Sequence, residues 1–357
     1  MQSKKSRRYG KTVFLSFLFL LVVLVGLTLY SSLLKKPSVT HRGLLQPEMI
    51  FKEHKAPLWA VAFSPDGNLV ASGSVDSTVK LWNKNDGRVV HTLKHPMGVT
   101  TINFNADGKT LATGSYDAVV RLWNVSNGTL IKALKGAGGT VWSVAFSPGG
   151  KTIAGCGEDR TIKLWDVETG ALLKTINAHK LNIWKVRFTP DGSQLISSSF
   201  DNTIRIWNAA TGDLLKTLEG HTEAVVGLAV SPDGKIIASG SDDKTIKLWD
   251  SNSGKLLRTL QNDDGHVYAV AFSPDGKRLI SGSRDKDNLG EIFQNFFGDG
   301  ATSKGISMRL WDVQSGELLE SLAEHANDVM DVCYSADGQW IASASDDQTV
   351  RLWRVLK

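Results

Sequence analysis

Residues 220–260 read GHTEAVVGLAVSPDGKIIASGSDDKTIKLWDSNSGKLLRTL, and close copies of this unit recur along the chain. The unit holds four short apolar runs. Turn signals follow the first three of them: Pro-Asp-Gly, Asp-Asp-Lys and Asn-Ser-Gly. Four strand-like runs separated by turns predict one four-stranded blade of a β-propeller.

A tryptophan ends the third run of each unit and marks the period of the repeat. Successive tryptophans are 41, 42, 42, 42, 62 and 42 residues apart, and they are Trp82, Trp123, Trp165, Trp207, Trp249, Trp311 and Trp353. A period in this range is typical of propellers, so seven copies predict an all-β, seven-bladed ring over residues 46–357. Such a ring hosts many functions, and the differences between repeats therefore carry the functional information.

Gly-His-like and Trp-Asp-like signatures recur at fixed places in the units, as at 220–221 and 249–250. With these signatures the chain resembles the WD-repeat (WD40) family, and its regularity resembles bacterial, especially cyanobacterial, members. The final repeat stops one strand short. The resemblance implies that a strand at 46–52 completes the last blade, which would remove an exposed sheet edge.

The repeated His, Ser and Asp residues imitate a catalytic triad. The resemblance instead implies that Trp, Ser, His and Asp form a buried hydrogen-bond network in each blade, and buried polar groups do need partners. The predicted histidines are His54, His95, His179, His221 and His325. The predicted aspartates are Asp76, Asp117, Asp159, Asp201, Asp243, Asp285 and Asp347. The serines two residues before most of them are Ser74, Ser115, Ser199, Ser241, Ser283 and Ser345.

Two blades depart from this pattern. In the third, Ala137 takes the His position and Gly157 the Ser position. In the sixth, Asp263 stands where His is expected, and His266 comes three residues later.

The resemblance places the second residue of each inner strand at the mouth of the central channel. These residues are Trp59, Thr100, Trp142, Trp184, Val226, Tyr268 and Met330. The residues before each Asp turn join the same face: Val75, Tyr116, Glu158, Phe200, Asp242, Arg284 and Asp346. Because Trp and Tyr are enriched in interface hot spots, we predict a protein-binding surface here. The alternative is that the aromatic rings pack against one another and fill the mouth.

The long spacing before Trp311 indicates an insertion at 286–306 in blade six, opening onto the same face. A helix is predicted there from the spacing of Leu289, Ile292, Phe293, Phe296 and Phe297. This helix packs on the propeller, covers the mouth, grips a partner or contacts lipid. Residues 285–291 lack the spacing of a calcium-binding loop, so no metal and no cofactor are predicted.

Residues 12–34, TVFLSFLFLLVVLVGLTLYSSLL, carry no charge. As a helix this segment would be about 35 Å long, enough to cross a hydrocarbon core of about 30 Å. The apolar core of a cleaved signal peptide is shorter, so we predict a single uncleaved transmembrane anchor. A short polar tether, 35–45, follows it. Five basic residues precede the span and three follow it. This bias predicts a cytoplasmic tail, 1–11, and an extracytoplasmic propeller, periplasmic in a bacterium.

The net charge of +5 comes from the N-terminal segment. Residues 1–42 hold eight basic residues and no acidic ones, which leaves 33 basic against 36 acidic residues in the rest. A nucleic-acid platform needs a basic face, so no nucleic-acid partner is predicted. The two cysteines, Cys156 and Cys333, fall in blades three and seven. We therefore predict two small buried apolar residues and no disulfide.

The predicted function is that of a membrane-tethered, non-enzymatic scaffold. It binds a protein partner through the aromatic mouth and the inserted helix. The alternatives are a small-ligand sensor or an enzyme using the mouth, and a scaffold in the cytoplasm. An enzyme would need acids, histidines or metal ligands converging at the mouth, where the sequence places mainly aromatic residues. The chain has no phosphate-binding loop, nucleophile elbow or zinc-ligand spacing.

Overall fold

The computed structural model describes residues 42–261, 265–283 and 307–356. The predicted anchor at 12–34 and the insertion at 286–306 lie outside these ranges. Among the described residues, no helix has the length and apolar character needed to span a bilayer.

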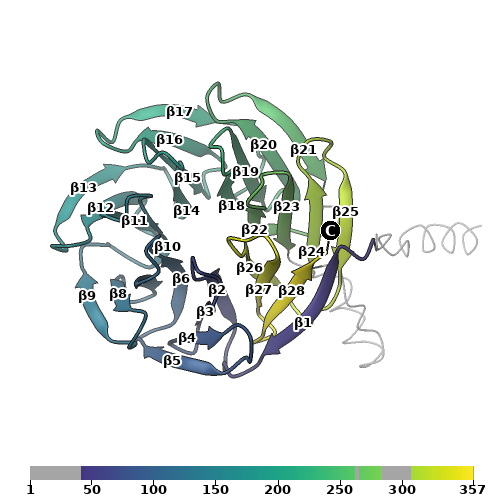
Figure 1. Ribbon diagram of the computed structural model, residues 1–357. Helices are drawn as coiled ribbons and strands as arrows, with labels where there is room; N and C mark the ends of the chain where they lie inside the picture. The colour runs from purple at the N-terminus through teal and green to yellow at the C-terminus, as the bar shows by residue number, and fades with distance from the viewer. Residues whose placement is uncertain (1–41, 262–264, 284–306, 357) are drawn as a thin grey trace, which may run out of the picture. The chain divides into compact units, whose positions relative to one another are not determined.

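Within the described residues, 28 strands form seven four-stranded antiparallel sheets (Figure 1). Blades one to three contain β2 (Leu58–Phe63), β3 (Leu69–Ser74), β4 (Thr78–Asn83), β5 (Val89–Lys94), β6 (Val99–Phe104), β7 (Thr110–Ser115), β8 (Val120–Asn124), β9 (Leu130–Leu134), β10 (Val141–Phe146), β11 (Thr152–Gly157), β12 (Thr161–Asp166) and β13 (Leu172–Asn177). Blades four to six contain β14 (Ile183–Phe188), β15 (Gln194–Ser199), β16 (Ile204–Asn208), β17 (Leu214–Leu218), β18 (Val225–Val230), β19 (Ile236–Ser241), β20 (Thr245–Asp250), β21 (Leu256–Gln261), β22 (Val267–Phe272), β23 (Arg278–Ser283), β24 (Met308–Asp312) and β25 (Leu318–Leu322). Blade seven contains β26 (Val329–Tyr334), β27 (Trp340–Ser345), β28 (Val350–Val355) and β1 (Leu45–Phe51).

The seventh blade joins the two ends of the described chain. Strand β1 pairs antiparallel with β28, so a strand lies where the sequence analysis expected one at 46–52. The buried Glu320 carboxylate accepts hydrogen bonds from the backbone amides of Leu44 and Leu45, at 2.7 and 2.9 Å. Figure 1 shows β1, in purple, beside the yellow β28. The first strand is therefore held both by its own sheet and by blade six.

The apolar core consists of seven clusters, and each cluster lies between two successive blades. Trp249 of blade five, for example, packs among residues of blade four such as Ile206. The cluster between blades seven and one includes Phe51 and Trp82, whose rings stack with centroids 4.9 Å apart. Because each blade buries its faces only against its neighbours, the ring is stabilised by closing.

Both cysteines are free, and they lie in different apolar clusters of the propeller. Cys156 belongs to the cluster between blades three and four, and Cys333 packs against the cluster between blades seven and one. Burial raises the pKa of both thiols. Cys156 is buried, as predicted, whereas Cys333 is half-buried and lines the channel.

Candidate functional site

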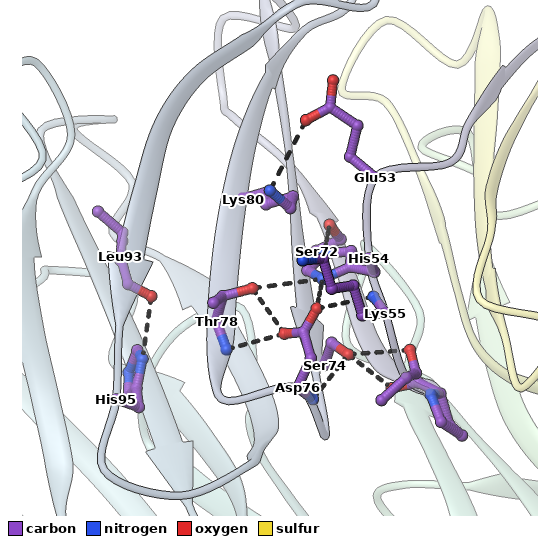
Figure 2. Close-up of polar contacts among 12 residues, drawn as sticks. Glu53, His54, Lys55, Ser72, Ser74, Asp76, Thr78, Lys80, Leu93 and His95 are labelled. Atoms are coloured by element: carbon purple, nitrogen blue, oxygen red, sulfur yellow. Dashed lines mark hydrogen bonds and ion pairs between the residues drawn. The ribbon is translucent and has the colours of Figure 1, made fainter.

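A chain of hydrogen bonds links four side chains in the first blade. His54 Nδ1 donates to Asp76 Oδ2 at 2.8 Å, and His54 Nε2 accepts from Ser72 Oγ at 2.8 Å (Figure 2). Ser72 Oγ in turn accepts from the indole N–H of Trp82 at 2.8 Å. The same chain occurs in blades four, five and seven, around His179, His221 and His325. The predicted Trp–Ser–His–Asp network is therefore present in four blades.

The predicted serines of this network were the wrong ones. The hydroxyl that accepts from the Trp lies four residues before the Asp: Ser72, Thr113, Ser197, Ser239, Ser281 and Ser343. In every case but Ser281 the same hydroxyl also contacts the His. The serine two residues before the Asp closes the turn instead. Ser74, for example, donates to the backbone oxygen of Pro57 at 2.9 Å and accepts from the amide of Asp76 at 3.1 Å. Alternate residues of a strand share a face, so spacing does not distinguish the two serines.

Blade two does not contain the predicted pair of His95 and Asp117. His95 Nε2 lies 2.8 Å from Thr113 Oγ1, but His95 Nδ1 lies 3.3 Å from the backbone oxygen of Leu93. Asp117 accepts two hydrogen bonds from the guanidinium of Arg121, at 3.0 and 2.6 Å. A bidentate guanidinium contact is a strong charge-assisted interaction, and it takes the carboxylate away from the histidine. Burial and then the charge of Arg121 lower the pKa of His95 to about 4.

This low pKa makes the stability of the propeller depend on pH. An unfolded histidine titrates near pH 6.5, so below that pH the unfolded chain binds a proton that folded His95 rejects. The contribution is complete above pH 6.5 and is lost as the pH falls toward 4. We expect a loss of about 2 kcal/mol from His95 between pH 7 and pH 5. Urea unfolding at the two pH values measures it. In His95→Gln the loss of unfolding free energy between the two pH values should be smaller than in the wild type by that amount. Equal losses in the two proteins would contradict the prediction.

Blade three lacks the network because it lacks both the histidine and the hydroxyl. With the corrected spacing, Gly155 and not Gly157 stands at the Ser position, and a Cβ there would lie 2.8 Å from the Trp165 ring. Trp165 donates its indole N–H to the backbone oxygen of Lys135 at 3.0 Å. Ala137, at the His position, packs against the apolar cluster between blades two and three. In blade six, Trp311 donates to Ser281 at 3.0 Å, while Asp263 and Asp285 lie outside the described residues.

Every inner strand carries a β-bulge at its second residue. The ladder register shifts at this residue in β2, β6, β10, β14, β18, β22 and β26. The seven bulged residues are those the sequence analysis assigned to the channel mouth: Trp59, Thr100, Trp142, Trp184, Val226, Tyr268 and Met330. A bulge takes a residue out of the ladder and redirects its side chain. The register shift is therefore the same at these seven positions, and only the side chains differ.

Three of the bulged residues bring their indole rings together. The ring centroids are 4.8 Å apart for Trp142 and Trp184, 5.5 Å for Trp59 and Trp142, and 5.9 Å for Trp59 and Trp184. Tyr116 lies edge-on to Trp142 at 5.6 Å, and Phe200 stacks on Trp184 at 5.3 Å. We call these five residues the aromatic mouth. Blades one and four are as far apart as a seven-bladed ring allows, so contact between Trp59 and Trp184 means that the indoles meet across the channel.

The aromatic mouth is packed and also accessible. Its rings contact one another, as the packing alternative expected, yet all five side chains are only half-buried. The indole N–H of Trp142 is buried, and none of the described residues accepts a hydrogen bond from it. An unsatisfied buried donor is uncommon in a core that serves stability alone. The geometry is therefore compatible with a surface that a partner contacts.

The other residues predicted at the mouth do not join the aromatic mouth. Thr100 and Val226 are buried, and Thr100 Oγ1 donates to the backbone oxygen of Val141. Tyr268 lies beside the ring of His266, with centroids 6.4 Å apart, and Met330 is half-buried. The remaining predicted partner-binding residues, Arg284, Phe293, Phe296 and Phe297, lie outside the described residues.

The family model of the WD domain, G-beta repeat, matches seven segments of the chain: 45–83, 87–124, 128–166, 170–208, 212–250, 254–287 and 316–354. The chain belongs to the WD-repeat family. Each matched segment begins with the outer strand of one blade and continues into the inner strands of the next, so the first segment begins with β1 of blade seven.

Curated relatives share short stretches with this WD-repeat protein. Nuclear distribution protein PAC1-2 of Uncinocarpus reesii is 42% identical over 55 residues, which are 15% of this chain and 12% of the relative. Periodic tryptophan protein 2 homolog of Schizosaccharomyces pombe is 44% identical over 46 residues, 13% of this chain and 5% of the relative. Protein HIRA of Xenopus laevis is 42% identical over 57 residues, which are 16% of this chain and 6% of the relative. The chain thus matches only a small part of each. All three are eukaryotic, and the bacterial resemblance stays a prediction.

Carboxylates lie around the mouth of this WD-repeat propeller. Glu158 is exposed, whereas Asp242 and Asp346 are half-buried. Burial, followed by the charges of Asp346 and Glu158, raises the pKa of the Tyr116 hydroxyl, so two of these carboxylates act on the aromatic mouth directly. Asp242 Oδ1 lies 2.9 Å from His266 Nδ1. The described rim is therefore acidic, with one histidine.

Three charged residues of the channel wall were not among the residues predicted from the sequence: Lys185, Arg187 and Asp331. They follow the bulges of β14 and β26. At the position of Lys185 and Asp331, the other repeats of this WD-repeat protein carry Ala60, Thr101, Ser143, Gly227 and Ala269. At the position of Arg187 the other repeats carry Ala62, Asn103, Ala145, Ala229, Ala271 and Cys333. Aligning the inner strands would have revealed these exceptions.

Proposed function

We propose that this WD-repeat protein is a membrane-tethered scaffold that binds a protein partner across its aromatic mouth. The observation that carries the proposal is the contact among five half-buried aromatic side chains, three at the bulges of the inner strands and two that follow β7 and β15. Large aromatic residues concentrate binding energy in interfaces. Propellers of the WD-repeat family typically act as scaffolds for protein interactions.

The Ser–His–Asp sets support a structural role rather than catalysis. Ser72 Oγ already donates to His54 and accepts from Trp82, and the serine is buried. A nucleophilic hydroxyl has to reach a substrate and to give its proton to the histidine during attack. The same closed arrangement leaves the serine hydroxyl buried in each of the four blades that contain it. Among the described residues no cluster of His, Cys, Asp and Glu has a geometry for a metal ion.

The acidic rim suggests the character of the partner. Asp346 and Glu158 lie close enough to Tyr116 for their charges to raise the pKa of its hydroxyl, and both carboxylates and aromatic faces attract cations. Complementary charge steers encounter and fixes the register of a complex. We therefore propose that the partner presents basic side chains to the mouth.

Affinity capture from gently solubilised membranes tests the scaffold. The full-length chain is compared with Trp59→Ala/Trp142→Ala/Trp184→Ala, after both are shown to unfold cooperatively. We expect a partner that the wild type retains and the triple variant loses. Leu172→Ala/Leu214→Ala/Leu257→Ala is the matched control, because it removes three exposed apolar side chains from outer strands. Equal capture by the wild type, the triple variant and the control would show that the aromatic mouth is not the partner site.

We also propose that residues 12–34 anchor the chain with the propeller outside the cytoplasm, on the basis of the uncharged span and its flanking charges. An alkaline phosphatase fused after Lys357 reports the side of the membrane, because this enzyme requires an oxidising compartment. Activity of the fusion is expected. An inactive fusion together with an active cytoplasmic reporter at the same position would reverse the topology.

A further inference from the structure

A cavity of about 400 Å³ lies in the central channel, bordered by the inner strands of blades two to seven. Its wall includes Phe146, Phe188 and Phe272, at the ends of β10, β14 and β22, and the prolines that follow some of these strands. The aromatic mouth is built at the beginnings of the inner strands. The cavity therefore occupies the opposite end of the channel and is distinct from the proposed partner site.

Three charged side chains line this cavity. The ammonium of Lys185 lies 3.7 Å from Asp331 Oδ1, which is beyond hydrogen-bond distance. The other oxygen of Asp331 accepts a hydrogen bond from the backbone amide of Val61 at 3.1 Å. The single carboxylate is thus shared between a cation and a neighbouring blade.

The guanidinium of Arg187 is the second cation in the wall. Its Nη1 donates to the backbone oxygen of Val186 at 2.9 Å and lies 3.3 Å from Ser143 Oγ. Its Nε and Nη2 have no hydrogen-bond acceptor among the described residues. Burial, opposed by the charge of Asp331, lowers the pKa of both Arg187 and Lys185. Two cations and one carboxylate leave this part of the cavity with one positive charge in excess.

The excess charge is not a requirement of the fold. Five other repeats build the same bulged strand with a small residue at the position of Lys185, and all six other repeats carry a small residue or Asn at the position of Arg187. Placing cations in a partly enclosed channel costs solvation free energy. An anion bound against them would offset that cost.

We propose that the cavity binds a small carboxylic acid with an apolar body. One carboxylate matches the single excess charge, whereas a phosphate monoester carries about −1.5 to −2 at pH 7. The free Nε and Nη2 of Arg187 suit a bidentate contact with a carboxylate, and Lys185 adds a second charge. Phe146, Phe188 and Phe272 supply the apolar wall. The volume falls within the range of about 300–1,000 Å³ found for small-molecule pockets.

Calorimetric titration of the full-length chain with benzoate at low ionic strength tests the site. Acetate lacks the apolar body and benzyl alcohol lacks the charge, so both should bind more weakly than benzoate. Inorganic phosphate should also bind more weakly. Equal binding of benzyl alcohol would reduce the effect to apolar partitioning, and tighter binding of phosphate would overturn the assignment of a carboxylate. Absence of benzoate binding would overturn the proposal.

Substitutions in the wall have opposite expected effects. Arg187→Gln and Lys185→Gln should each weaken benzoate binding by about tenfold or more, because each removes a charge-assisted contact. Asp331→Asn keeps an acceptor for Val61 but removes a repelling charge, so it should tighten binding. Lys235→Gln changes an exposed lysine and should match the wild type. Wild-type affinity for benzoate in Arg187→Gln, or unchanged or weaker affinity in Asp331→Asn, would contradict the proposed carboxylate site. This outcome is independent of the scaffold proposal.

Discussion

Deleting residues 45–51 is expected to abolish the cooperative unfolding transition of the propeller. The deletion removes β1, leaves the hydrogen-bonding edge of β28 unpaired and withdraws the buried side chains of Leu45 and Phe51. Truncating a buried Leu costs about 2–5 kcal/mol and a buried Phe about 3–5 kcal/mol. The sum is comparable to the whole stability of a typical domain, about 5–15 kcal/mol. Deletion also takes from the Glu320 carboxylate one of its two backbone donors.

Urea unfolding followed by circular dichroism measures this effect on the full-length chain in mild detergent. Gln46→Ala/Glu48→Ala is the control, because it changes two exposed side chains of β1 and keeps the strand. We expect the control to stay within about 0.5 kcal/mol of the wild type. A deletion variant that unfolds cooperatively at the wild-type midpoint would show that the ring does not depend on this closure.

Replacing Trp249 by alanine is expected to reduce the free energy of unfolding by about 3–5 kcal/mol, the range for a buried Trp. Trp249 is 2% exposed and packs between blades four and five. Its indole N–H donates to Ser239 Oγ at 2.8 Å, and Ser239 also contacts His221. The substitution therefore creates a cavity between two blades and removes one member of the polar network.

Two further variants separate packing from hydrogen bonding at this position. Trp249→Phe keeps most of the apolar volume and loses the indole N–H, so a loss of about 1–2 kcal/mol is expected. Leu257→Ala, on the outer strand β21, removes a side chain that is 54% exposed, and its effect should stay within about 0.5 kcal/mol. Chemical denaturation of the three variants gives the comparison. A cost below 1 kcal/mol for Trp249→Ala would contradict the assignment of this residue to the core.

The repeated tryptophans and turn signals alone identified the class of fold, because turn chemistry and strand alternation are local properties. Pro-Asp-Gly and Asp-x-Thr turns recur at a nearly constant spacing, so seven local units could be recognised independently of one another. The closure by a strand before Leu58 was inferred from the resemblance and from a count of strands. In the structure, β1 pairs with β28. The same regularity gave no information about function, because the repeated residues stabilise the blades.

The tertiary structure alone decided which side chains meet. Ser72 and Ser74 share a strand face, and only the position of the His54 ring selects Ser72. Asp117 pairs with Arg121 rather than His95 because a guanidinium four residues away reaches both carboxylate oxygens. Contacts between blades join residues far apart in the chain, such as Trp59 and Trp184 or Lys185 and Asp331. Such meetings depend on the curvature of the closed ring, which no local pattern in the sequence encodes.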